Sequence, residues 1–335
     1  MDTESTLLLS RGDVDQLLNL SDCIDAVEKV FRQQHDLALP GLLGIKTQTG
    51  GLHVKTAMLS AERHYIVAKL NTNFPGNREH FGLPTIQGLL LLYDADSGRV
   101  LAVIDSIDIT IKRTAAATAV AAKYLARKDS SVATICGCGQ QSRAQLRALL
   151  LILPLTTICA FDIDERAAIA FAAELSRELK IDIELVRNLP EAIRNSDVCV
   201  TCTTAPKFFV RQEDVASGTF IAAVGADDVH KQEIDPALIA SAKVVADSLQ
   251  QCCAIGDTHH AIEKALMRRE NVYAELSEIV SGAKPGRINE DEIIIFDSTG
   301  VAIEDAAAAT LVYEKARSTA IRNQFDFAAF AANAR

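Results

Sequence analysis

Two glycines, Gly137 and Gly139, stand between the apolar run VATIC and the polar, helix-prone run QQSRAQ. Glycines at such a strand-to-helix turn permit a tight bend and let backbone N–H groups approach a pyrophosphate. Ser142 takes the place of the third glycine of the usual fingerprint, and a small serine is expected to pack there almost as closely. A tight turn without a ligand is the alternative, but the elements that follow favour a nucleotide site.

Asp162 ends the next apolar run, TTICAF, 25 residues after Gly137. A carboxylate at this place bonds the adenosine ribose and repels a 2′-phosphate, which favours NAD(H) over NADP(H). Arg166 leaves NADP(H) open, because a loop arginine can accept that phosphate. Thr203 and Thr204 end a later strand, where they either line the nicotinamide side or are ordinary strand-end hydroxyls.

Lys69 lies within the strand-like run YIVAKLN. Because side chains alternate along a strand, Lys69 shares a face with Tyr65, Val67 and Asn71. A lysine among such neighbours is a candidate partner for a substrate carboxylate, whereas an edge-strand lysine that prevents aggregation is the alternative. Lys55, in GLHVKTAML, poses the same choice.

Arg113 precedes the alanine-rich run TAAATAVAAKYLAR, which predicts a helix over 114–127. A cation at a helix start opposes the helix dipole, so Arg113 suggests a bound anion. Asp227 and Asp228 end the apolar run TFIAAVG, where the carboxyl ends of parallel strands bind ligands. A solvated loop pair is the alternative.

The order of the elements predicts an α/β protein with two domains. Residues 12–36 have the pattern of one amphipathic helix, and strands are expected over 43–105, with a hairpin at ADSG. The polar residues 128–131 suggest a boundary. Beyond it, six apolar strands alternate with helical segments, which predicts a doubly wound parallel sheet of the Rossmann type over 129–300. The strands are VATIC, TTICAF, IDIELV, VCVTC, TFIAAVG and KVVAD, followed later by IIIFDSTG. A helix over 301–318 is expected to pack back on the first domain.

Composition excludes several functions. The net charge is −10 without a lysine- or arginine-rich run, so no nucleic-acid partner is expected. No apolar run reaches the ~18 residues of a membrane helix. The eight scattered cysteines suit a reducing compartment, and the short apolar run near the N-terminus is no secretion signal, so a cytoplasmic location is expected. No metal site is predicted, because adjacent His259 and His260 should point apart on a helix and the pair Cys199 and Cys202 stands alone.

Several stretches together resemble the ornithine cyclodeaminase/mu-crystallin family, which includes archaeal-type alanine dehydrogenases and cyclic ketimine reductases. The resemblance extends from about residue 8 to 318 and rests on AKLNTNFPGN, GLPTIQGLLLLYDADSG, RTAAATAVAAKYLAR, ICGCGQQSRAQ, VGADDVHKQEIDP and FDSTGVAIED. It implies NAD(P), a homodimer, and a substrate-binding and dimerisation domain formed by residues 1–128 and completed by about 301–335.

The resemblance also implies roles for individual residues. Lys46, Lys69 and Arg113 take places beside the substrate carboxylate, and Asp227 takes that of the aspartate that handles the amine or imine nitrogen. Thr85 lies where a threonine near the nicotinamide is found. The implied cofactor site comprises Thr85, Arg113, Gly137, Gly139, Gln140, Gln141, Asp162, Thr203, Thr204, Val224 and Ser298.

Lys55 is the main departure from the ornithine cyclodeaminases, which carry an acid on this strand for the distal ammonium of the substrate. A lysine there would repel that ammonium. We therefore expect NAD(P)H-dependent reduction of an α-imino acid, such as Δ1-pyrroline-2-carboxylate or another ketimine, to an L-amino acid, or the reverse dehydrogenation. Ornithine cyclodeaminase, alanine dehydrogenase and a non-catalytic binding protein of the mu-crystallin type are the alternatives.

Overall fold

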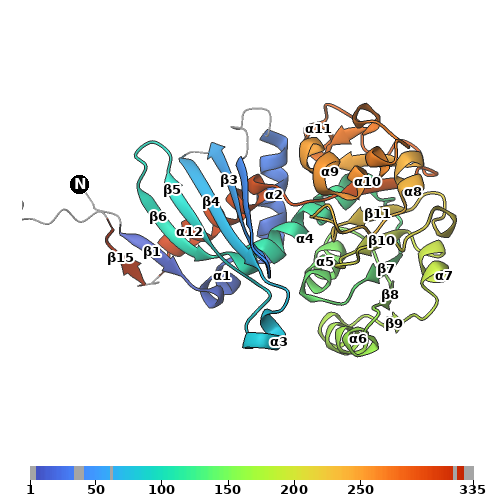
Figure 1. The fold of residues 1–335 in the computed structure, drawn as a ribbon, viewed down its shortest axis with the longest axis horizontal. Helices are drawn as coiled ribbons and strands as arrows, with labels where there is room; N and C mark the ends of the chain where they lie inside the picture. Colours follow the sequence, from blue (N-terminus) through green and yellow to red (C-terminus); the bar gives the residue numbers. More distant parts are fainter. Residues whose placement is uncertain (1–4, 34–40, 61–62, 320–322, 328–335) are drawn as a thin grey trace, which may run out of the picture. The chain divides into compact units, whose positions relative to one another are not determined.

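The computed structural model describes residues 5–33, 41–60, 63–319 and 323–327. The chain forms two compact units, Met1–Arg113 with Val301–Arg335, and Thr114–Gly300 (Figure 1). The division falls inside helix α4 (Ser106–Leu125), so the polar stretch at 128–131 lies within the second unit.

The first unit is built on a seven-stranded sheet. In spatial order its strands are β15 (Gln324–Phe325), β1 (Thr6–Leu9), β6 (Val100–Asp105), β5 (Ile86–Asp94), β4 (His64–Asn73), β3 (Gly51–Ser60) and β2 (Gly41–Lys46). Strands β2 to β6 are antiparallel in chain order, and β5 and β6 form the hairpin predicted at ADSG. Strand β4 therefore lies inside the sheet, with a partner on each side.

One face of this sheet is covered by helix α12 (Ala302–Arg317), which packs on β3, β4 and helix α2 (Leu20–Gln33), as predicted (Figure 1). The alanines of α12 are buried, which lets its backbone approach the strands closely. Alternation along the strands directs a second set of apolar side chains to the opposite face. This open face includes Leu8, Leu43, Ile45, Ile66 and Leu89, which are 38–64% exposed.

The helices predicted over 12–36 and over 114–127 both differ in their bounds from the observed helices. The helix expected over 12–36 is divided into α1 (Arg11–Leu17) and α2, because the chain leaves helical geometry at Leu18 and the Asn19 side chain accepts from Asp22 N to begin the second helix. Residues 34–36 lie outside the described part of the chain. A short helix, α3 (Asn77–Phe81), follows β4.

Helix α4 begins at Ser106, not at Thr114, so Arg113 is in its third turn. The argument that Arg113 opposes the dipole at a helix start is therefore wrong. The segment SIDITIK misled the prediction because its β-branched residues have low helix propensity, which tertiary packing overrides here.

The second unit contains an eight-stranded sheet in which every pairing is parallel. Its spatial order is β13 (Ala274–Glu275), β12 (Lys243–Ala246), β14 (Ile294–Asp297), β11 (Phe220–Ala223), β10 (Val198–Thr201), β7 (Val132–Cys136), β8 (Thr157–Phe161) and β9 (Ile183–Leu185). All six predicted strands are present. Strand β14 enters between the fifth and the sixth, an insertion that chain order did not reveal.

Helices connect these strands on both faces of the sheet (Figure 1). They are α5 (Gln140–Leu150), α6 (Glu165–Leu179), α7 (Leu189–Arg194), α8 (Pro236–Ser241), α9 (Leu249–Ile255), α10 (Asp257–Glu263) and α11 (Leu276–Val280). The chain proceeds outward from β7 in one direction to β9 and in the other to β10 and β11. Doubly wound sheets bind ligands at such a reversal, outside the carboxyl ends of the strands. Among the described helices, none combines the length and apolar content needed to cross a bilayer.

Candidate active site

The glycine turn lies at the carboxyl end of β7. Gly137 has a φ of +88°, and a Cβ atom there would lie 2.8 Å from the carbonyl oxygen of Cys202. Gly139 is the N-cap of α5; no side chain caps the helix there, and an added Cβ atom would meet nothing within 4 Å. The start of α5 thus offers backbone N–H groups beside a bare glycine surface, which fits a pyrophosphate. Ser142 is fully buried, as expected for the third position of the fingerprint.

Asp162 follows β8, beside this turn. Its Oδ2 atom accepts from Cys138 N at 2.7 Å, and its Oδ1 atom accepts from Asp164 N at 2.8 Å. Backbone donors thus hold the carboxylate next to the glycine turn, while its remaining lone pairs can accept from a ribose hydroxyl. Arg166 is exposed at the start of α6.

A buried carboxylate that the sequence analysis overlooked organises the neighbouring strand ends. Glu233 is fully buried and accepts from Thr201 Oγ1, Thr203 N and Thr203 Oγ1 at 2.6 Å each, and from Gly225 N at 2.8 Å. Burial raises the pKa of Glu233, although these hydrogen bonds favour its charged form. The hydroxyl of Thr203 is therefore engaged with Glu233, whereas Thr204 is exposed.

In the first unit, Lys69 is only 4% exposed, and its Nζ atom lies 2.6 Å from Asp305 Oδ2 in α12. Because β4 is an interior strand, the interpretation of Lys69 as an edge-strand lysine is wrong. Burial lowers the pKa of Lys69 to about 7; Asp305 opposes this shift, and the cations Arg113 and Lys55 reinforce it.

Arg113 binds two adjacent acids of α12, Glu304 and Asp305. Its Nε atom donates to Asp305 Oδ1 at 2.9 Å, and its Nη1 atom donates to Glu304 Oε2 at 2.6 Å. Burial by itself would raise the pKa of Asp305, but Arg113 and Lys69 hold it below the usual value. Glu304 and Asp305 were not singled out from the sequence; the only signal was two acids in the first turn of a predicted helix.

Lys55 is directly opposite Lys69 in the β3–β4 register, so the two side chains share a face of the sheet. We call Lys55, Lys69, Arg113, Glu304 and Asp305 the basic cluster. With all five ionised, it holds three positive and two negative charges, a net charge of one positive.

The structure does not bring every predicted residue of this unit into the basic cluster. Lys46 is exposed at the end of β2, where it pairs with Gly51 of β3. Gly51 is four residues from Lys55 along β3, a distance of roughly 13 Å. Thr85 precedes β5, is half-buried, and accepts from Phe74 N through its carbonyl oxygen.

A sequence profile described as the ornithine cyclodeaminase/mu-crystallin family matches residues 4–320. The chain belongs to the ornithine cyclodeaminase/mu-crystallin family. Three solved structures share its fold over nearly the whole chain. An archaeal alanine dehydrogenase dimer with bound NAD has a TM-score of 0.92 and 37% identity, covering 96% of this chain and 99% of the other.

The Δ1-pyrroline-2-carboxylate reductase of Thermococcus litoralis, in complex with NADH and L-proline, has a TM-score of 0.88 and 34% identity, covering 93% of this chain and 98% of the other. The iminosuccinate reductase of Paracoccus denitrificans, in complex with NAD+, has a TM-score of 0.86 and 31% identity, covering 94% and 97%. These relatives act on different substrates, so family membership alone leaves the substrate of this chain open.

In this family member, Asp227 lies in the loop after β11. Its side chain is 56% exposed, and its Oδ1 atom pairs with Lys231 Nζ at 2.5 Å. Asp227 is therefore a solvent-accessible carboxylate with a lysine as its partner. Of the other predicted cofactor residues, Val224 N donates to Thr201 O, and buried Ser298 donates from its hydroxyl to Asp247.

Gln140 and Gln141 occupy the first turn of α5, the former exposed and the latter half-buried. The expectation that His259 and His260 point apart is wrong, since their ring centroids are only 5.3 Å apart in α10. Cys199 and Cys202 are free thiols.

Proposed function

We propose that this protein is an NAD(H)-dependent oxidoreductase that reduces an α-imino acid to an L-amino acid or catalyses the reverse dehydrogenation. Cyclic ketimines such as Δ1-pyrroline-2-carboxylate are the first candidates. The observation that carries the proposal is the basic cluster, in which a buried lysine and a buried arginine balance two carboxylates and the neighbouring Lys55 adds one positive charge. Such a cluster is complementary to one further anion.

The anion that fits is the carboxylate of the substrate. Lys69 and Arg113 are already paired with Asp305, which holds their side chains in position before a ligand arrives. A substrate carboxylate that reaches Lys69 would favour the charged form of the lysine, because it adds a second negative charge beside it, after that of Asp305. It would also neutralise the net positive charge of the basic cluster. In this proposal Lys69, Arg113 and Lys55 bind and orient the substrate.

The second unit fits the cofactor. A bound nicotinamide would supply the hydride. Gly139 and the start of α5 would hold its pyrophosphate, and Asp162 would accept from the adenosine ribose and disfavour a 2′-phosphate. We propose that the remaining cofactor contacts come from Gln140, Gln141, Thr203, Thr204, Val224 and Ser298. Asp227 is proposed to give a proton to the imine nitrogen, a role that an Asp227→Asn variant tests.

Alanine dehydrogenase is the second candidate, because the archaeal alanine dehydrogenase is a relative with 37% identity over almost the whole chain. Ornithine cyclodeaminase is less well supported. Lys55 projects beside Lys69, and a distal ammonium in contact with it would meet a repulsion of roughly 1 kcal/mol or more. A purely binding role does not require a buried lysine with a pKa near neutrality.

We also propose a homodimer in the cytoplasm. The open face of the first unit exposes apolar side chains from several strands, including Leu43 at 64% and Ile45 at 56%, and burial of these side chains against a second copy would favour association. The related archaeal alanine dehydrogenase is a dimer. The eight cysteines are all free, which suits a reducing compartment.

The test compares three reactions of the purified protein. Oxidation of NADH and of NADPH is followed with Δ1-pyrroline-2-carboxylate, and separately with pyruvate plus ammonia, while ammonia release is measured from ornithine with NAD. We expect NADH oxidation with the cyclic imine and no ammonia from ornithine. Faster turnover of pyruvate would favour alanine dehydrogenase, ammonia release would refute the argument from Lys55, and no turnover with any substrate would refute the enzyme proposal.

The Lys55 argument has its own variants. Lys55→Glu places an acid at the position opposite Lys69, and Lys55→Met removes the charge without replacing it. If Lys55 excludes a distal ammonium, the glutamate variant should bind ornithine more tightly than the methionine variant by at least fivefold. Equal affinities would mean that Lys55 does not face the substrate side chain.

A further inference from the structure

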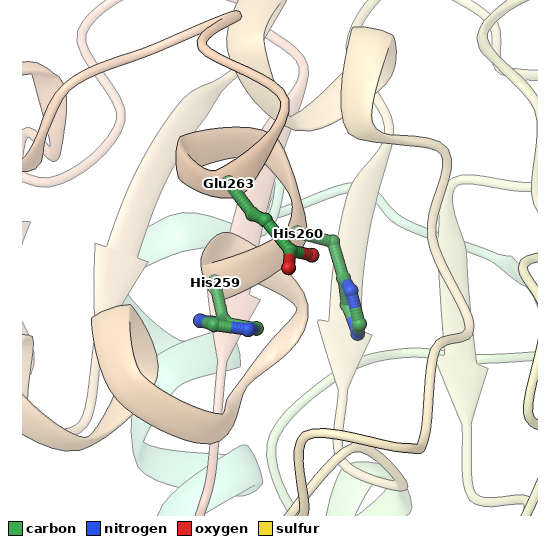
Figure 2. Close-up of side chains that lie close together, drawn as sticks. All are labelled: His259, His260 and Glu263. Atoms are coloured by element: carbon green, nitrogen blue, oxygen red, sulfur yellow. The ribbon is translucent and has the colours of Figure 1, made fainter.

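Helix α10 carries three side chains that the proposed reaction does not use. His259 and His260 are adjacent, and Glu263 follows about one turn later. One nitrogen of each ring and one oxygen of Glu263 all lie within 4.8 Å of one another. Figure 2 shows the carboxylate between the two imidazole rings.

One nitrogen of each ring faces a backbone carbonyl. His259 Nδ1 lies 3.3 Å from Cys253 O, and His260 Nε2 lies 2.8 Å from Lys231 O. Because a carbonyl oxygen only accepts, these two nitrogens carry the hydrogens, which leaves lone pairs on His259 Nε2 and His260 Nδ1. Metal-binding histidines characteristically donate their second N–H to a carbonyl or carboxylate, which fixes the tautomer in this way.

We propose that His259, His260 and Glu263 form a binding site for a divalent transition-metal ion, with zinc as the best fit. Two imidazole nitrogens and a carboxylate oxygen are ligands that zinc accepts, and a solvent molecule would complete a tetrahedron. Calcium and magnesium prefer all-oxygen sites and are disfavoured. Tetrahedral ligands at about 2.1 Å from zinc are about 3.4 Å apart. The three ligand atoms lie within 4.8 Å of one another, so both the imidazole rings and the exposed Glu263 side chain would move closer together when an ion binds.

The site has a structural consequence for the loop that contains Asp227. His260 bonds the carbonyl of Lys231, and the ammonium of Lys231 pairs with Asp227. An ion that immobilises His260 would therefore restrain residues 227–231, and their amide hydrogen exchange should slow when the metal is bound.

The experiment uses the full chain, freed of metal with a chelator and titrated with Zn²⁺ and, as a spectroscopic probe, Co²⁺. We expect one ion per chain, visible cobalt bands of a tetrahedral N/O site, and a rise in Tm of roughly 4 °C at a zinc concentration about 100-fold above Kd. Glu263→Gln, which keeps the size of the side chain, should weaken binding at least tenfold, as should His259→Gln.

His80→Gln is the matched control. His80 also has a ring nitrogen near a carbonyl, 2.9 Å from Gly76 O, but belongs to another helix, so the variant should bind the ion like the unaltered protein. Absence of saturable binding, or equal binding by the Glu263→Gln variant, would overturn the proposal. An intense near-ultraviolet thiolate-to-cobalt band would place the ion on cysteine and would overturn it as well.

Discussion

Replacing Lys69 by methionine should remove most of the activity while leaving the fold in place. The difference between the ordinary lysine pKa of 10.5 and about 7 means that the folded protein disfavours the charged form by about 5 kcal/mol. The variant therefore loses a charge that folding does not favour. Asp305 keeps a counterion in the variant, because Arg113 Nε lies 2.9 Å from its Oδ1 atom. We expect the free energy of unfolding to change by less than about 2 kcal/mol.

Catalysis should respond much more strongly. A bound substrate carboxylate left without its lysine partner loses about 2–5 kcal/mol of binding free energy, so kcat/KM for the imino acid should fall by roughly 30- to 5000-fold. The assay is steady-state NADH oxidation, with urea unfolding in parallel. Lys112→Met is the control, because Lys112 pairs with Asp15 outside the basic cluster. A Lys69→Met variant within about threefold of the unaltered kcat/KM would refute the assignment.

The same lysine makes a prediction about pH. Its pKa is lowered on folding, so between pH 7 and 10.5 the unfolded chain binds more protons and stability should rise with pH. Because the charged form binds the substrate, kcat/KM should fall over the same range, starting near pH 7. In Lys69→Met, the free energy of unfolding and kcat/KM should both depend less on pH over this range. If the substitution leaves the pH profile of kcat/KM unchanged, this reasoning is wrong.

Three further predictions concern the second unit. Gly139→Val should leave Tm within about 2 °C, because φ is −81° and nothing lies within 4 Å of the new Cβ, but should raise the Kd for NADH at least tenfold by calorimetry. Asp162→Ser should increase the ratio of kcat/KM with NADPH to that with NADH, and an unchanged ratio would refute the ribose role. Glu233→Ala should destabilise the protein by about 3 kcal/mol or more in urea unfolding, because four hydrogen bonds lose their acceptor, whereas Glu233→Gln should be milder.

Local pattern was sufficient for the strands of the second unit. A parallel strand that is buried on both faces is a nearly continuous apolar run, and VATIC, TTICAF and VCVTC are of this kind. Pattern was insufficient for α4, whose first two turns are rich in β-branched residues and become helical through their tertiary contacts. It was also insufficient for β14, because a crossover connection does not reveal which strand it will join.

The sequence by itself determined the family, the glycine turn and the residues that carry charge, because these depend on the identity and order of neighbouring residues. Only the tertiary structure decided what surrounds Lys69. Its neighbour Lys55 depends on strand register, and its counterion Asp305 is 236 positions later in the chain. Burial and distant charges set the pKa of a lysine and its chemistry, and neither is encoded within one turn or one strand of the chain.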